Sequence, residues 1–351
     1  MPDEDRVAKI ISIATAVPKY KISQDDIGKL AARVFGTSMD DFSRLAPVYG
    51  NAAIETRYSC VPLEWYEQPC LFSERNRLYQ ENAVNLLAEA GQKALARANL
   101  SFDDIDGLVV VSSSGIATPS LDAMLMEKLH LKRNMERLPI FGLGCVGGVL
   151  GLARTAQLAR GAPDKRYLYM VVELCGLDFI HADCTKSNVI ATALFADGAA
   201  AAVISCTGEG PAIVGWNEHT WPDSLDIMGW DVSDEGLRVI FSQDIPTIVR
   251  RDMRRIVDKF LASQKLEIKD IAEFLCHPGG AKVVDAIEAA LDLSSGRLHH
   301  ARNVLRDYGN MSAATIMFVL EAGLSSPRAG HYLFSSFGPG FTAGLVLLQV
   351  K

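Results

Sequence analysis

The chain has 351 residues, of which 49% are hydrophobic and 22% charged, a composition typical of a globular protein with a large apolar core. This composition excludes a disordered tail and a fibrous repeat. At about 150 residues per domain, the length predicts two domains or one large duplicated domain. The 42 acidic and 35 basic residues give a net charge of −7, which argues against nucleic acid as a partner.

The N-terminal segment predicts a strand rather than a targeting signal, because it is acidic before the short apolar run 10–17. No apolar run reaches the roughly 18 residues that a membrane helix requires. The seven cysteines are scattered without a C-x-x-C pair, and the histidines lack metal-ligand spacing. We therefore expect no disulfide framework, no metal, no membrane span and a cytoplasmic location.

Further along the chain, runs that predict strands alternate with runs that predict helices. The predicted strands are Leu108–Ser112, Tyr167–Val172, Ala200–Ser205, Phe274–Cys276 and Leu345–Gln349. The predicted helices include Glu81–Ala98, Val149–Arg160 and Ile248–Ser263. This alternation predicts an α/β fold in which helices pack on sheets.

Segments of the first part of the chain return in the second part in the same order, which predicts a duplication. Residues 99–109 align with residues 265–275, each as a helix end, a capping acid and a buried strand. The same offset places Gly144–Cys145 on Asn310–Met311, where each pair stands in a turn of small residues before an apolar helix.

A third echo pairs Phe195-Ala-Asp-Gly with Phe337-Gly-Pro-Gly, each followed by a strand. The Gly-rich segment Thr207–Pro211 is the best candidate for a seam between the repeats. We therefore predict two similar halves, residues 1–208 and 209–351.

Cys145 stands in a glycine turn between an apolar run and a long apolar helix. The glycines allow close approach of a substrate, and the helix N-terminus favours a thiolate, which predicts a nucleophile with a lowered pKa. The same stretch matches G-x-G-x-x-G at Gly142, Gly144 and Gly147, and Glu173 ends the next strand, as in a nicotinamide-dependent oxidoreductase. A third interpretation makes Cys145 a small buried hydrophobe, and the local pattern leaves all three open.

His277 and Asn310 complete the candidate site. His277 leaves a buried strand through a Pro-Gly-Gly turn, which places it at the strand end where α/β sites gather, although a lone histidine is more often structural. Asn310 precedes a helix near Ser312, and capping that helix is its default interpretation. The alignment of the repeats, which places Asn310 beside the position of Cys145, predicts a catalytic role instead. In that interpretation the Cys145 thiol, the His277 imidazole and the Asn310 amide face a single cavity.

Four motifs together resemble the type III polyketide synthases, the chalcone synthase-like enzymes, over essentially the whole chain. They are Gly-Cys-Val-Gly-Gly at Cys145, His-Pro-Gly-Gly at His277, Gly-Asn-Met-Ser at Asn310 and Phe-Gly-Pro-Gly at Phe337. The resemblance implies the thiolase fold, two α/β halves in a five-layer αβαβα arrangement, and a homodimer. It also implies acyl-CoA and malonyl-CoA as substrates, with no cofactor.

Within this resemblance, Cys145 is the acyl-accepting nucleophile and His277 stabilises its thiolate as an ion pair. His277 and Asn310 hold the malonyl thioester carbonyl, whose oxygen gains charge as CO₂ leaves. Phe195 matches the gatekeeper phenylalanine between the cavity and the CoA tunnel. The other residues that we expect to bind substrate are Phe337, Gly338, Pro339, Gly340, Val239, Ser113, Thr118 and Cys175.

Several positions depart from the plant enzymes. Val239 replaces their second gatekeeper phenylalanine, and Ser336 replaces the glycine before Phe-Gly-Pro-Gly. Of their basic CoA-contacting cluster, Arg44 is a loose match, while Pro47 and Asn51 occupy the other places. The resemblance therefore leaves the CoA contacts unassigned.

The segments at Glu173, Lys186 and Ala193 look most like bacterial alkylresorcinol and alkylpyrone synthases. We therefore expect an acyltransferase that extends a long-chain fatty acyl-CoA by decarboxylative condensation and cyclises the product to an alkylpyrone or alkylresorcinol. The first alternative is a tetrahydroxynaphthalene synthase-like enzyme, although those usually carry a cysteine where Ser113 stands. The others are a β-ketoacyl-carrier-protein synthase, which normally shows His-Gln-Ala-Asn at His277, and the oxidoreductase. A non-catalytic thiolase-like binding module comes last, because all three site residues are present.

Overall fold

The structure of the chain is a computed structural model that describes residues 6–36, 39 and 42–351. The strands are β1 (Lys9–Ala16), β2 (Tyr20–Ser23), β3 (Thr56–Ser59), β4 (Gly107–Val111), β5 (Glu136–Ile140), β6 (Arg166–Leu174), β7 (Asp197–Ser205), β8 (Ala212–Thr220), β9 (Met228–Ser233), β10 (Gly236–Phe241), β11 (Ile271–Cys276), β12 (Gly330–Gly338) and β13 (Thr342–Val350). The α-helices are α1 (Gln24–Phe35), α2 (Phe42–Leu45), α3 (Pro47–Asn51), α4 (Phe72–Arg97), α5 (Leu121–Lys128), α6 (Gly147–Gly161), α7 (Lys186–Leu194), α8 (Ile245–Ser263), α9 (Ala281–Leu291), α10 (His299–Tyr308) and α11 (Thr315–Leu324). Short 3₁₀ turns used below are η2 (Leu63–Glu67), η3 (Phe102–Asp104), η4 (Gly144–Val146), η5 (Cys175–Asp178), η6 (Ile268–Asp270) and η7 (Ser312–Ala314).

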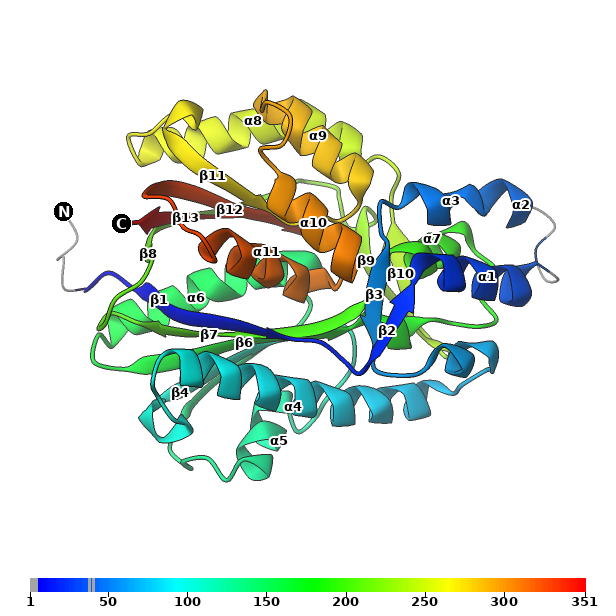
Figure 1. Cartoon of the computed structure of the whole chain (residues 1–351), viewed down its shortest axis with the longest axis horizontal. Coiled ribbons are helices and arrows are strands. Elements are labelled where there is room, and N and C mark those ends of the chain that lie inside the picture. The colour runs from blue at the N-terminus through cyan, green and yellow to red at the C-terminus, as the bar shows by residue number, and fades with distance from the viewer. Residues whose placement is uncertain (1–5, 37–38, 40–41) are drawn as a thin grey trace.

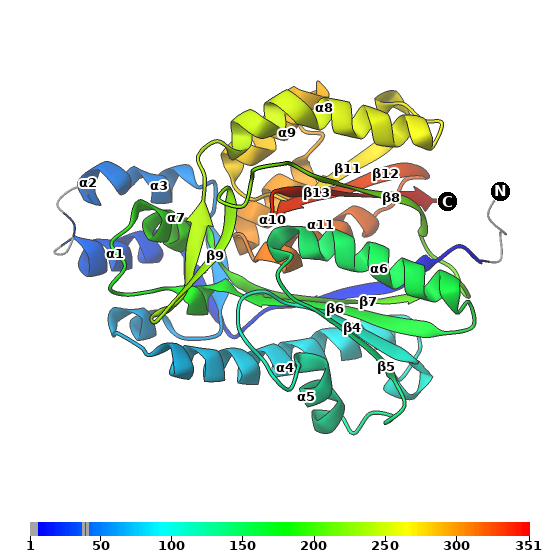
Figure 2. The ribbon, with the colours of Figure 1, turned by 180° about the vertical axis from the view of Figure 1, so that it is seen from behind.

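Five layers of helices and sheets make up the body of the molecule. Helices α6 and α11 lie between two stacked groups of strands, with α4 and α5 on one outer face and α8 and α9 on the other (Figure 1). The reverse view shows α6 running along the interface between the two groups (Figure 2). This αβαβα arrangement confirms the predicted duplicated α/β fold. Among the described residues, no helix has the length and apolar character needed to cross a membrane.

The two groups of strands share one topology. In the first, the order is β5-β4-β6-β7-β1, with β4 parallel to β6 and the β6–β7 and β7–β1 pairs antiparallel. In the second, the order is β11-β12-β13-β8, with one parallel pair followed by two antiparallel pairs, so among the described residues it lacks a counterpart of the parallel strand β5. Strands β1 and β8 meet at Lys9 and Ala212, which joins both groups into one nine-stranded sheet.

The first predicted echo recurs in backbone detail. After α4 and α8, the chain passes through a left-handed residue, Asn99 (φ 53°) or Lys265 (φ 61°). In the turns η3 and η6 that follow, the Asp104 or Asp270 carboxylate accepts a hydrogen bond of 2.8 Å from the backbone N–H that begins the turn. The parallel strand β4 or β11 comes next, so both halves enter their sheets in the same way.

The second echo has a different register from the predicted one. Turn η4 leads into α6 and turn η7 leads into α11, as expected for two equivalent helix starts. Because η4 begins at Gly144 and η7 at Ser312, Cys145 corresponds to Ala313 rather than to Met311. The connection is two residues longer in the second half, and this insertion places Asn310 just ahead of the turn.

The third echo joins positions that are not equivalent in the fold. Phe195 follows α7 and precedes β7, whereas Phe337 lies within β12. The strands that do correspond, β7 and β13, begin at Asp197 and Thr342. The predicted pairing is therefore wrong by three residues, although the order of the elements is right.

Candidate active site

The turn that carries Cys145 is fixed by hydrogen bonds from its own half of the chain. Gly142 and Gly144 have positive φ angles of 89° and 47°, a region that favours glycine. Their N–H groups donate to the Ser113 hydroxyl at 3.2 and 3.1 Å. The turn then continues as η4 into α6, so Cys145 lies at a helix start, as predicted.

Two of the three glycines in the G-x-G-x-x-G match, Gly144 and Gly147, serve close packing rather than the approach of a dinucleotide. A Cβ on Gly144 would lie 2.6 Å from Pro339, and one on Gly147 would lie 2.7 Å from Val111. Glu173, which the oxidoreductase interpretation places on a ribose, is fully buried and accepts a hydrogen bond of 3.0 Å from the Ser113 N–H. The oxidoreductase interpretation is therefore wrong.

The Cys145 thiol faces the second half of the chain. Its Sγ donates a weak hydrogen bond to the Ser312 hydroxyl at 3.5 Å. Burial raises the pKa of Cys145 to about 12, although the contact with Ser312 acts in the opposite direction. The prediction of a lowered pKa is therefore wrong for the thiol on its own, because loss of water around sulfur outweighs the helix N-terminus.

His277 leaves the end of β11, as predicted, and lies in a dry environment. Its side chain is only 4% exposed, and its backbone N–H donates to the Ser335 carbonyl at 2.9 Å. Neither ring nitrogen has a hydrogen-bond partner among the described residues. Burial lowers the pKa of His277 to about 3, so the isolated ring is neutral.

Asn310 links the turn before α11 to the loop after His277. Its Oδ1 accepts a hydrogen bond from the Ser312 N–H at 2.9 Å, although Met311 rather than Asn310 is the N-cap residue of the turn η7. Its Nδ2 donates to the Gly279 carbonyl at 3.1 Å, which leaves a second N–H on the same amide. The backbone of Asn310 also pairs with Leu194 and Ala196 on either side of Phe195, at 2.9 Å each.

These contacts link the side chains of Cys145 and Asn310 to the turn that follows His277. Cys145 reaches Ser312, Ser312 is bonded to Asn310, and Asn310 is bonded to the Gly279 carbonyl in the turn after His277. Burial opposes a lone thiolate and a lone imidazolium alike. In a buried site, a thiolate and an imidazolium that form together keep the net charge at zero, which costs less than either charge alone.

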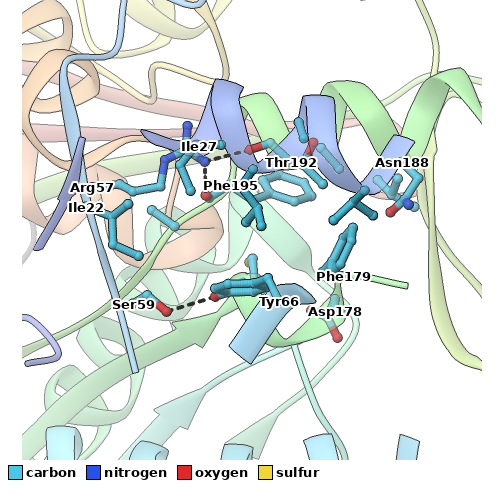
Figure 3. Close-up of a pocket in the computed structure, with 18 of the residues that line it drawn as sticks. Ile22, Ile27, Arg57, Ser59, Tyr66, Asp178, Phe179, Asn188, Thr192 and Phe195 are labelled. Carbon is cyan, nitrogen blue, oxygen red and sulfur yellow. Dashed lines mark hydrogen bonds between the residues drawn. The ribbon is translucent and has the colours of Figure 1, made fainter. Parts of the chain in front are cut away.

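A mostly apolar pocket lies beneath α1 (Figure 3), and Cys145, His277 and Asn310 are not among the described residues that line it. Its cavity volume is about 60 Å³. Phe195 and Tyr66 approach it from opposite sides. Its lining residues are Ile22, Ile27, Leu30, Ala31, Val34, Phe35, Arg57, Tyr58, Ser59, Tyr66, Cys175, Gly176, Asp178, Phe179, Asn188, Ala191, Thr192, Phe195, Ala196, Trp230 and Val239.

Trp230 supplies an aromatic side chain beside Val239, the position where the plant enzymes carry a second gatekeeper phenylalanine. The two residues are partners across the β9–β10 pair. The Trp230 ring lies 6.1 Å from the Phe195 ring at an angle of 60°. The pocket therefore keeps two aromatic groups at this end, although one of them comes from the neighbouring strand.

A second cavity lies on the other side of α7, against the Gly279–Gly280 turn. Its charged lining residues are Arg44, Lys186 and Lys282, and the described residues that line it include no acidic one. Pro47 and Asn51, the other two positions of the plant CoA cluster, also line it. Lys282 was missed by sequence reasoning, because a lysine at a helix start has no distinctive pattern.

The remaining predicted substrate residues lie around the nucleophile turn. The Ser113 hydroxyl accepts hydrogen bonds from that turn, and Thr118 lies in the loop between β4 and α5. Phe337 is buried and stacks on Phe341 at 5.8 Å, within the core of the second half. Gly338 packs against Leu143 and Val146, and Pro339 packs against Gly144. Gly340 lies in the turn before β13. Of the predicted set, Phe195, Val239 and Cys175 line the apolar pocket, and direct substrate contact by the others stays a prediction.

Comparison with known proteins assigns the family. Residues 4–208 match the N-terminal domain of chalcone and stilbene synthases, and residues 217–350 match their C-terminal domain. The chain is 38% identical to a putative chalcone synthase of Bacillus subtilis over 98% of this chain and 99% of that protein. It is 36% identical to the 1,3,6,8-tetrahydroxynaphthalene synthase of Streptomyces peucetius over 98% of this chain and 94% of that enzyme.

Solved structures agree with this assignment. The type III polyketide synthase domain of Steely1 from Dictyostelium matches with a TM-score of 0.90 and 25% identity, over 98% of this chain and 99% of that domain. The brown-algal enzyme PKS-I of Ectocarpus siliculosus matches with a TM-score of 0.89 and 27% identity, over 98% of both chains. The five-layer arrangement is therefore the thiolase fold of type III polyketide synthases.

The fold and the matched family models define a condensing acyltransferase. The chain belongs to the chalcone and stilbene synthase family, the type III polyketide synthases. Enzymes of this family catalyse decarboxylative condensation of malonyl-CoA and use CoA thioesters without a further cofactor. The β-ketoacyl-carrier-protein synthase, which was one of the predicted alternatives, is therefore not the family of this chain.

Proposed function

We propose that the enzyme extends a long-chain fatty acyl-CoA with malonyl-CoA and cyclises the product to an alkylpyrone or alkylresorcinol. The apolar pocket beneath α1 is the observation that supports this starter most directly. Ile27, Leu30 and Val34 line it from one face of α1, and Phe179 lines it from the segment after η5. Each methylene group moved from water into such a pocket contributes about 0.8 kcal/mol, so an alkyl chain is the group that it binds best.

The first chemical step in this proposal loads the starter on Cys145. The thiol proton passes to the unpartnered His277 ring, and the thiolate attacks the thioester carbonyl of the acyl-CoA. The carbon–sulfur bond to CoA then breaks, CoA leaves as a thiol with that proton, and an acyl thioester remains on Cys145. The dry surroundings of both groups disfavour a lone thiolate or a lone imidazolium, so the two charges form together as an ion pair.

The second step uses the two buried hydrogen-bond groups at the site. The malonyl thioester carbonyl accepts hydrogen bonds from the free amide N–H of Asn310 and from the single N–H of His277, whose ring is neutral again after CoA has left with the proton. Loss of CO₂ leaves an electron pair that forms an enolate, and these donors stabilise its oxygen. The enolate carbon attacks the acyl thioester, Cys145 leaves as thiolate, and the chain is now two carbons longer on CoA.

The cavity beside the Gly279–Gly280 turn fits the CoA end of the substrates. Lys186 and Lys282 have no ion-pair partner among the described residues, and both project from the first turns of helices that lack acidic residues there. A phosphate-bearing carrier satisfies these positive charges. Helix α7 separates this cavity from the apolar pocket and ends at Phe195, so thioester and chain lie on opposite sides of the gatekeeper.

A tetrahydroxynaphthalene synthase-like reaction is the second candidate, because a relative that carries this name is 36% identical over nearly the whole chain. Such an enzyme is expected to need malonyl-CoA alone. The apolar lining beneath α1 favours the fatty starter over this candidate.

One incubation separates the two candidates. Wild type and Cys145→Ala are given carbon-13 malonyl-CoA with and without lauroyl-CoA or stearoyl-CoA, and the products are identified by mass spectrometry. We expect labelled alkylpyrones or alkylresorcinols from wild type only when the fatty acyl-CoA is present. Labelled tetrahydroxynaphthalene from malonyl-CoA alone, or equal turnover by the variant, contradicts the proposal.

The proposal includes a homodimer in the cytoplasm, where Cys145 stays reduced. Phe141 is 62% exposed and Ile116 is 41% exposed. The bond between Ser113 and Gly142 holds the loops that carry these apolar residues close together. Exposed apolar groups of this kind favour contact with another protein surface. Light scattering is expected to give twice the chain mass, and Phe141→Asp is expected to reduce it; a monomeric wild type contradicts the dimer.

A further inference from the structure

Ser336 occupies the place where the plant enzymes that the chain resembles carry glycine. It lies on β12 with a side chain only 2% exposed. Its hydroxyl donates a hydrogen bond of 2.8 Å to the backbone carbonyl of Cys145. A serine at this position therefore adds a directional contact to the nucleophile turn that glycine cannot make.

The residue before it holds the other partner of the thiol. The Ser335 carbonyl accepts a hydrogen bond of 2.9 Å from the His277 N–H. Two consecutive residues of one strand thus bind the backbone of Cys145, from the first half, and the backbone of His277, from the second half. The separation of thiol and imidazole depends on this short piece of β12.

The strand is well placed to act as a rigid support. Strand β12 pairs with β11, which delivers His277, and with β13 on its other side, where Ser336 faces Gly344. Two residues further on, a Cβ on Gly338 would lie 2.6 Å from the Val146 side chain and 2.8 Å from its N atom. The strand therefore lies directly against η4, and the Ser336 hydroxyl fixes the register of this contact.

We infer that Ser336 is a positioning residue, which sets the place of the Cys145 thiol relative to the His277 ring. The inference rests on the roles proposed above for Cys145 and His277. Reacting groups must be held within about 0.5 Å of their productive geometry, and a single backbone hydrogen bond is enough to control a shift of this size. Loss of the hydroxyl is expected to weaken proton transfer without removing any group that touches substrate.

The test compares Ser336→Ala and Ser336→Gly with Ser335→Ala. Ser335 is a matched control, because it is also buried and its hydroxyl makes no hydrogen bond with the described residues. The rate at which iodoacetamide modifies the peptide that contains Cys145 is measured against pH, together with kcat, KM and the melting temperature. We expect both Ser336 variants to react about three- to tenfold more slowly near pH 7.5, with their pH profiles shifted to higher pH and KM unchanged. Ser335→Ala is expected to match wild type.

Ser336→Gly keeps the test decisive if the alanine variant fails to fold, since glycine fits wherever serine does. Wild-type rates and pH profiles in the folded Ser336 variants would overturn the inference and leave the proposed function intact. Equal losses in Ser335→Ala would overturn it too, because the effect would then be structural. Full activity of wild type after modification of Cys145 would instead contradict the proposed function itself.

Discussion

Replacing His277 with leucine separates the contribution of the imidazole from that of burial. Leucine keeps the surroundings of Cys145 dry but removes the proton acceptor. Burial raises the pKa of the thiol to about 12. At pH 7.5 a thiol with this pKa is ionised in only about 3 of 100,000 molecules. A group with a raised pKa stays protonated below that value, so its thiolate fraction grows tenfold with each pH unit.

Modification of Cys145 by iodoacetamide reports this fraction when the modified peptide is quantified by mass spectrometry. We expect His277→Leu to react at least about 100-fold more slowly than wild type near pH 7.5, and its rate to rise tenfold per unit up to about pH 10. The wild-type rate is expected to level off at much lower pH, because proton transfer to His277 creates both charges together. Matching rates and pH profiles in the two proteins would refute the coupled pair.

Three further predictions follow from the packing and the two cavities. Gly338→Ala is expected to lower kcat at least about tenfold, because the new methyl group displaces the backbone of Leu143–Val146. Steady-state kinetics measure the loss of kcat, and a thermal melt shows whether the variant is still folded. Ala31→Phe fills the pocket beneath α1 and removes space for about four methylenes, so kcat/KM is expected to fall about 100-fold for stearoyl-CoA and to change little for hexanoyl-CoA. The exposed Ala32→Phe is the control, and equal losses on both starters would mean that the alkyl chain binds elsewhere. The double variant Lys186→Glu, Lys282→Glu is expected to raise KM for acyl-CoA at least about tenfold, because it removes two positive charges from the second cavity. KM for N-acetylcysteamine thioesters, which lack the CoA phosphates, is expected to stay the same, and the control Lys259→Glu on α8 is expected to change neither KM.

The places of Cys145, His277 and Asn310 in the fold were predictable because these residues stand in short motifs tied to sheet and helix ends. The apolar strand before His277 and the glycine turn around Cys145 each fix where a side chain emerges. The ionisation of these groups was not predictable in the same way. A helix N-terminus can be seen in the sequence and suggests a low thiol pKa, whereas the desolvation that dominates here depends on residues from the other half of the chain.

The pocket beneath α1 was hidden for a related reason. Ile27, Leu30 and Val34 recur with the period of an amphipathic helix, and the same spacing describes a helix packed on a solid core. The start of α4 at Phe72, nine residues before the predicted one, was also missed. Its N-cap residue Leu71 makes no side-chain hydrogen bond, so the usual start signal is absent.

Detection of the acyl-enzyme tests the account most directly. Wild type is incubated with stearoyl-CoA in the absence of malonyl-CoA, quenched in acid and digested, and the peptide that contains Cys145 is examined by mass spectrometry. We predict one stearoyl group on that peptide, its absence in Cys145→Ala, and its loss with release of labelled product once carbon-13 malonyl-CoA is added. A stearoyl group on another residue, or none at all while product still forms, would contradict the assignment of Cys145 as the nucleophile for a fatty acyl starter.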